Sequence, residues 1–152
     1  MNESLPMDGP AAPDAARPLL TGGVTRGVVR MLWHMGFSPL TEFKLTSGRR
    51  IDVAGLDGRG RFLFVEVKSS VEDFRADGKW HEYPDFCDWF YFAVPPGFPQ
   101  AVLPEGAGLI VADGYDGAVL RAAPQTPLNG NRRRRQTLDF ARAAADRLMR
   151  GI

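Results

Sequence analysis

Apolar residues recur every three or four positions between Thr21 and Gly36, and this spacing predicts an amphipathic helix over residues 22–35. Gly36 ends the pattern, because glycine commonly follows the last turn of a helix. The residues expected on the buried stripe of this helix are Val24, Val28, Met31, Leu32 and Met35.

Three predicted strands follow this helix. Residues 39–45 and 49–56 are separated by turn residues 46–48, which indicates a hairpin. A second turn at residues 57–60 leads into residues 61–68, where apolar side chains are nearly continuous. A strand of this kind is covered on both faces, so residues 61–68 are predicted to lie at the centre of the sheet.

The second half of the chain alternates between helical and strand-like segments. Residues 71–86 are polar and partly helical, residues 89–94 and 108–112 are apolar strands, and residues 132–150 form a helix with a basic start. The predicted order is helix, three strands, helix, two strands and helix, which indicates an α/β fold. Residues 1–20 lack periodicity and are predicted to form a flexible tail before a single domain at 21–152.

Composition excludes several classes of protein. Hydrophobic residues make up 44% and charged residues 24%, as in a globular protein rather than a disordered or fibrous one. No segment approaches the ~20 apolar residues that span a bilayer, and the N-terminus has no secretory signal pattern. The single cysteine, Cys87, cannot form an internal disulfide and is expected to be a buried packing thiol in a cytoplasmic protein.

Glu66 and Lys68 are the two charged residues inside the most apolar strand. They lie two positions apart, so their side chains point to the same face of the sheet. Burying both charges is costly unless they pair or bind a metal. A simple ion pair at the strand end is an equally good explanation when these two residues are considered alone.

The predicted position of Asp52 in the hairpin favours a functional role for Glu66 and Lys68 over a simple ion pair. If Gly58, Arg59 and Gly60 form a three-residue loop, Asp52 lies directly opposite Glu66, with Cβ atoms roughly 4.5 to 5.5 Å apart. A loop of even length would place Asp52 on the other face. Two carboxylates this close require a cation or a proton between them.

Paired carboxylates with an open coordination sphere suit Mg²⁺ or Mn²⁺, which bind phosphate oxygens as well. Such an ion lowers the pKa of a bound water and neutralises developing charge. Lys68 would then orient or deprotonate the attacking water and stabilise negative charge. The residues therefore indicate phosphodiester hydrolysis.

Asp52, thirteen residues, then Glu66-Val67-Lys68 on a predicted hairpin resembles the PD-(D/E)xK nuclease superfamily. More narrowly, the stretch from Thr25 to about Val94 resembles the MmcB-type bacterial DNA-repair proteins, which are described as endonucleases. The matching segments are residues 25–27, 42–43, 48–52, 65–70, 77–83 and 87–95.

This resemblance implies an αβββαβ core with a mixed central sheet flanked by helices, and a DNA-repair role in the bacterial cytoplasm, associated with the nucleoid. It also implies a metal held by Asp52, Glu66 and the Val67 carbonyl, with Lys68 catalytic. Many members carry a glutamate in the first helix, where this helix offers Thr25, Arg26 and Gly27. Glu42 would supply an additional carboxylate if it projects to the same face.

Basic and aromatic residues near the predicted site are candidates for contact with DNA, although each also has a plain structural explanation as a solvated charge or a packed ring. The run of four arginines is unfavourable at a helix N-terminus, so helix stabilisation does not account for it. The DNA-binding candidates are Arg26, Arg49, Arg50, Lys79, Trp80, Tyr83, Arg132, Arg133, Arg134 and Arg135.

Three functions stay open from the sequence. The leading hypothesis is a deoxyribonuclease acting on structured or damaged DNA during repair. The second is a DNA-binding or adaptor subunit that keeps the nuclease fold and recruits other repair proteins. The third is a nuclease directed at RNA, because phosphate contacts do not distinguish the sugar. A homodimer is also open, since many proteins of this fold pair to cut two strands.

Overall fold

The structure is a computed structural model and describes residues 17–151. The first helix, α1 (Arg17–His34), begins five residues earlier than predicted. Residues 17–20, expected in the tail, are therefore helical, and the rest of the predicted tail lies outside the described residues.

A single mixed sheet contains the strands in the order β1-β2-β3-β4-β5-β6. The pairings β1–β2, β2–β3 and β5–β6 are antiparallel, whereas β3–β4 and β4–β5 are parallel. The predicted three-strand meander is confirmed, as is the α/β class. The strands are β1 (Ser38–Lys44), β2 (Arg50–Leu56), β3 (Phe62–Val67), β4 (Trp89–Val94), β5 (Gly108–Ala112) and β6 (Gly117–Arg121).

Strand β6 corrects the predicted order, which had two strands after the middle helix instead of three. It lies at the edge of the sheet, and its side chains are exposed or half-buried. An edge strand needs no continuous apolar run, so the pattern that reveals buried strands is absent here.

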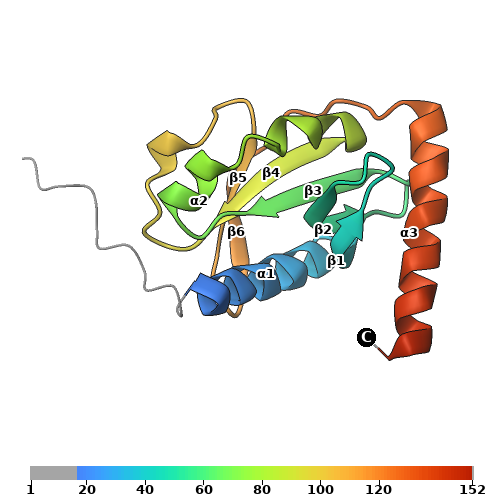
Figure 1. Ribbon diagram of the computed structural model, residues 1–152, viewed down its shortest axis with the longest axis horizontal. Coiled ribbons are helices and arrows are strands. Elements are labelled where there is room, and N and C mark those ends of the chain that lie inside the picture. The colour runs from blue at the N-terminus through green and yellow to red at the C-terminus, as the bar shows by residue number, and fades with distance from the viewer. Residues whose placement is uncertain (1–16, 152) are drawn as a thin grey trace, which may run out of the picture.

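Two layers of helices enclose the sheet (Figure 1). Helix α1 covers one face, where Val24, Val28 and Leu32 pack against side chains of β2 to β5. The other face is covered by α2 (Val71–Ala76), the short 3₁₀ turns η1 (Trp80–Glu82) and η2 (Pro84–Phe86), and part of α3 (Gly130–Arg150). A further 3₁₀ turn, η3 (Gln100–Val102), lies between β4 and β5. Every residue of β3 is buried, which confirms its predicted central place.

A buried carboxylate, Asp88, connects this central strand to the C-terminal helix. Its side chain accepts hydrogen bonds from the main-chain N–H groups of Phe62 (2.7 Å) and Leu128 (3.1 Å). The guanidinium of Arg133 donates to both of its oxygens, at 2.6 and 2.9 Å. Burial raises the pKa of Asp88, but these donors outweigh it and hold the pKa below its usual range. We call this group of four residues the Asp88 clasp.

The clasp explains part of the arginine run. Arg133 is committed to Asp88, and Arg132 lies over the Phe86 ring while donating to the Asp85 carbonyl. Arg135 pairs with Asp139 one turn further along the helix. These contacts account for three of the four arginines, which helix stabilisation did not explain. The fourth, Arg134, is exposed at the surface.

Cys87 is buried and free, as expected of a packing thiol, and burial raises the pKa of its thiol above the usual value. Among residues 17–151 no helix is both long and apolar enough to cross a membrane.

We expect Arg133→Met to lower the free energy of unfolding by about 3 kcal/mol, because it leaves the buried charge of Asp88 without its cation. Urea denaturation followed by tryptophan fluorescence measures the change. The matched control is Arg134→Met, at the exposed neighbour, which should alter stability by less than about 0.5 kcal/mol. Equal losses in the two variants would show that the clasp contributes nothing specific.

Candidate active site

The loop between β2 and β3 has the predicted three residues. The Asp57 carboxylate accepts hydrogen bonds from the N–H groups of Arg59 and Arg61, both at 2.9 Å, and pairs with the Arg61 guanidinium at 2.7 Å. Gly60 adopts a φ of 78°, which glycine accepts without strain. Asp57 and Arg61 also pair through the main chain, so the loop closes the hairpin in an odd register.

This register places the two predicted carboxylates together. Val53 pairs with Val65 and Leu56 with Phe62, so the next step along β2 brings Asp52 opposite Glu66. The Asp52 Oδ2 atom accepts a hydrogen bond from the Val67 N–H at 2.7 Å, which aims the carboxylate across the hairpin. The predicted face and register of Asp52 are thus confirmed.

Glu66 lies in a strongly perturbed environment. It is 6% exposed, and burial raises its pKa, as do the hydrogen bond and the negative charge of Asp52. The nearby Lys68 ammonium lowers it, but by less. We therefore expect Glu66 to hold a proton at neutral pH in the absence of a cation.

Lys68 is paired with Asp77, a residue that sequence reasoning did not select. The Lys68 Nζ atom lies 2.7 Å from Asp77 Oδ2, and both side chains are largely buried. Burial lowers the pKa of Lys68, but the contact with Asp77 and the charges of Glu66 and Asp73 outweigh it, so the pKa is raised. In this arrangement Lys68 is an ammonium ion.

Asp77 follows the last residue of α2, and its other oxygen accepts the Lys79 N–H at 2.8 Å. The signal that could have identified it is the cost of a lone buried ammonium at Lys68, which requires a carboxylate partner. The sequence does not predict the direction of the Asp77 side chain, because residues 71–86 form a short helix and 3₁₀ turns rather than one regular element.

Glu42 does not join the carboxyl pair, contrary to the expectation of an additional ligand. Its backbone has a φ of 50°, and this left-handed residue interrupts the alternation of β1. As a result Phe43 enters the core while the Glu42 side chain is exposed. Within residues 17–151, no three Asp, Glu, His or Cys side chains are spaced to bind a metal ion together.

The segment of the first helix that resembles the family motif has a packing role. Thr25 donates to the Thr21 carbonyl, and Gly27 faces the turn at Asp113 and Asp116 so closely that a β-carbon there would clash with main-chain atoms. Arg26 is exposed on α1, which covers the face of the sheet opposite the carboxyl pair. It therefore does not converge on the site.

The remaining basic candidates differ in how free they are to contact DNA. Arg50 and Lys79 are exposed near the site, whereas Arg49 pairs with Glu82 at 2.7 Å. Because Arg50 leads into Asp52 along β2 and Lys79 follows Asp77, both cations lie on segments that carry site residues.

The two aromatic candidates are mostly engaged within the protein. Tyr83 is buried, and its hydroxyl donates to the Arg50 carbonyl at 3.0 Å. Its pKa is raised by burial and by the neighbouring carboxylates of Glu66, Asp52 and Asp77. Trp80 is half-buried against Phe90 and Phe92. Only part of the Trp80 surface is therefore open to a ligand.

The model of the MmcB-like family, described as DNA repair protein MmcB-like, matches residues 9–152. The chain belongs to this family. The chain is also similar to the solved structure of a protein of unknown function from Silicibacter pomeroyi, with a TM-score of 0.81 and 41% sequence identity. That similarity covers 84% of this chain and 88% of the other. No curated protein matches the MmcB-like chain.

We expect Asp77→Asn to lower the pKa of Lys68, because the variant loses the charge-assisted hydrogen bond from Asp77 that most opposes the effect of burial. An NMR titration of ¹³C-labelled lysine side chains measures it, since the sequence has only three lysines, Lys44, Lys68 and Lys79. Asp85→Asn, at an exposed carboxylate, is the control and should leave the titration unchanged. An unaltered Lys68 titration in Asp77→Asn would contradict the assigned pairing.

Proposed function

We propose that this MmcB-like protein is a metal-dependent DNA endonuclease acting in DNA repair, with its reacting centre at Asp52, Glu66 and Lys68. The observation that carries the proposal is the meeting of Asp52 and Glu66 across the hairpin, beside a buried lysine. A structural ion pair alone would not need a second carboxylate whose charge opposes the first.

The donor set fits a hard divalent cation, Mg²⁺ or Mn²⁺. Asp52 and Glu66 offer carboxylate oxygens, and the hydrogen bond from Val67 to Asp52 brings the main chain of Val67 beside them, so its carbonyl would complete the set. The raised pKa of Glu66 supports this reading, since a cation would replace the proton that now relieves the repulsion. When bound, the ion would supply a water of lowered pKa and neutralise charge on the phosphate.

Lys68 would act as a positioned positive charge. Its ion pair with Asp77 fixes the ammonium on the same face as the carboxyl pair and keeps it protonated. A protonated lysine can orient a water and stabilise negative charge on a phosphate oxygen, whereas it cannot accept a proton. The structure thus favours the stabilising role of Lys68 over the role of general base.

DNA would approach over the exposed cations near the site, Arg50 and Lys79, which we propose contact the phosphate backbone. Arg134 is exposed on α3 and is available for the same purpose. We infer a structured or damaged DNA as substrate from the repair family rather than from any base-reading side chain. RNA stays an alternative substrate because these contacts are to phosphate.

The second candidate function is an adaptor subunit that binds DNA and recruits other repair proteins or a second copy of the chain. One observation favours it: α3 carries apolar side chains that the domain does not cover, with Leu148 85% and Met149 89% exposed. Exposed apolar residues on a helix rich in arginine are typical of surfaces that bind protein partners.

We expect the purified protein to bind Mn²⁺ with release of one proton, because the cation displaces the proton of Glu66. Isothermal titration in buffers of different protonation enthalpy measures this release. Affinity should rise about tenfold per pH unit while Glu66 is protonated. The variants Asp52→Asn and Glu66→Gln should lose binding, whereas Glu82→Gln, at an exposed carboxylate, should retain it. Failure of the wild type to bind Mn²⁺ would favour the adaptor.

We expect Lys68→Ala to abolish cleavage while leaving DNA binding largely intact, because the ammonium acts on the reacting phosphate. Arg50→Ala should mainly weaken binding, since its contact is to the backbone. Cleavage of branched, gapped and linear DNA with Mg²⁺, together with fluorescence anisotropy without metal, separates the two effects. Cleavage retained by Lys68→Ala would refute the role given to this residue.

A further inference from the structure

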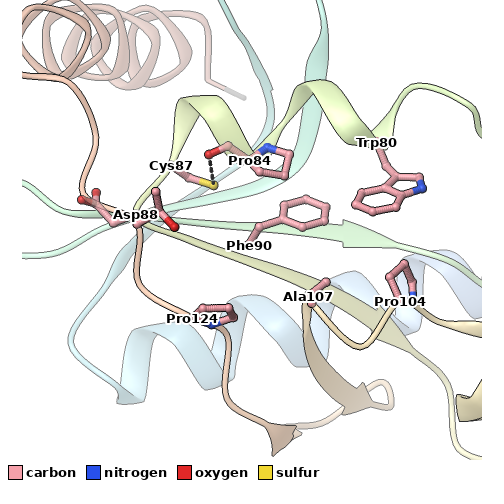
Figure 2. A pocket seen from close by; sticks show the side chains of 10 residues that line it. Trp80, Pro84, Cys87, Asp88, Phe90, Pro104, Ala107 and Pro124 are labelled. Atoms are coloured by element: carbon pink, nitrogen blue, oxygen red, sulfur yellow. Dashed lines mark hydrogen bonds between the residues drawn. The ribbon is translucent and has the colours of Figure 1, made fainter.

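A cavity of about 230 Å³ lies on the same face of the sheet as the carboxyl pair, between the 3₁₀ turns and the segments that follow β4 and β6. Figure 2 shows Trp80, Pro84 and Phe90 along one side, with Pro104, Ala107 and Pro124 across from them. We call this cavity the proline slot. Its volume lies below the roughly 300–1,000 Å³ of sites for drug-sized ligands, so it suits an occupant of ring size.

The walls of the proline slot are flat. The rings of Trp80 and Phe90 are nearly parallel and stack with an offset, with 8° between their planes and 6.1 Å between their centres, so both line the slot in the same orientation. The opposite wall presents proline rings and the methyl group of Ala107, which pack well against a planar ligand. The shape therefore favours a flat ring over a branched aliphatic group.

Both proline-bearing segments are anchored by hydrogen bonds. Arg121 donates to the carbonyls of Pro104 and Ala107, at 2.8 and 3.0 Å. On the other segment, the Thr126 N–H donates to the Asp88 carbonyl at 2.8 Å. The proline slot is thus formed before any ligand binds, which reduces the entropy lost on binding.

The interior of the proline slot is electrically neutral. The Asp88 carboxylate belongs to the clasp, where each of its oxygens accepts a main-chain N–H and an Arg133 N–H. The Cys87 thiol is protonated, since burial raises its pKa, and it lies near the carbonyls of Tyr83 and Pro84 (Figure 2). A phosphate or a charged side chain would find no counter-ion there, so the expected occupant is an uncharged ring.

The proline slot adjoins the candidate active site through Trp80 and Phe92. Their ring centres are 5.3 Å apart, and Phe92 pairs with Glu66 across the β3–β4 ladder. Trp80 also follows Lys79, whose N–H is bound by Asp77, the partner of Lys68. A nucleotide whose phosphate reached the carboxyl pair would carry its base toward the Trp80 side of the slot.

We propose that the proline slot binds an unstacked nucleobase of the DNA on which the site acts. This inference rests on the proposed function in one respect, which is that the ligand is DNA. Stacking on an aromatic wall is tolerant of base identity, and it is available only to bases that are single-stranded or extruded from the duplex. The slot would thereby direct the protein to gapped, damaged or branched DNA rather than to a defined sequence.

The test measures binding without metal, so that no cleavage step enters. The probe is a short single-stranded oligodeoxynucleotide carrying 2-aminopurine, whose fluorescence is quenched when the base stacks. We expect quenching on binding to the wild type, and about tenfold weaker binding of a matched oligonucleotide with abasic sites. Trp80→Ala removes an aromatic wall of the slot, and Ala107→Leu fills it. Each variant should lower the affinity for the intact probe by about tenfold and leave the affinity for the abasic probe unchanged.

Trp33→Ala is the matched control, because Trp33 is an exposed tryptophan on α1, remote from the slot. Equal affinity of the wild type for intact and abasic DNA would overturn the proposal, whatever the variants show. The expected occupant of the slot would then be an apolar side chain of a protein partner. Lys68→Ala should keep full quenching. If the protein fails to bind Mn²⁺ or to cleave DNA but still quenches the probe, the proposed nuclease function is rejected. The proposal that the slot binds a nucleobase is then still supported.

Discussion

The register of the β2–β3 hairpin is the constraint on which the candidate site depends. Side chains alternate faces along a strand, so a slip of one residue would move Asp52 to the side covered by α1. Asp57 prevents the slip by binding two N–H groups and the guanidinium of the loop that follows it. A surface turn thereby decides whether two carboxylates meet in the interior.

Among residues 17–151, the buried charged side chains fall into two groups that differ in how completely their charges are paired. In the clasp, Asp88 has donors for both oxygens and a full positive charge beside it, so it has no further capacity for a ligand. At the site, the carboxyl groups of Asp52 and Glu66 lie side by side, so Glu66 must hold a proton or bind a cation, and Lys68 pairs with a third carboxylate, Asp77. Burying two neighbouring carboxyl groups is costly for stability, and such arrangements are concentrated at functional sites.

The sequence predicted those features that depend on local periodicity. Strand β3, its central position and the proximity of the Asp52 and Glu66 side chains follow from an apolar run and a loop of three residues. Asp77 and Arg133 could not be placed in this way, because their positions depend on how irregular segments return to the sheet. The exposure of Glu42 depends on one left-handed residue, which a period-two pattern does not reveal.

The clasp also has a consequence for synthesis of the chain. Asp88 and Arg133 are 45 residues apart in the sequence, and the partner N–H of Leu128 is 40 residues from Asp88. While the ribosome is still translating the segment between them, Asp88, the residue before β4, has neither its cation nor one of its main-chain donors. The buried charge of Asp88 is therefore neutralised only after the start of α3 has left the exit tunnel, so the contribution of the clasp to stability comes late in synthesis.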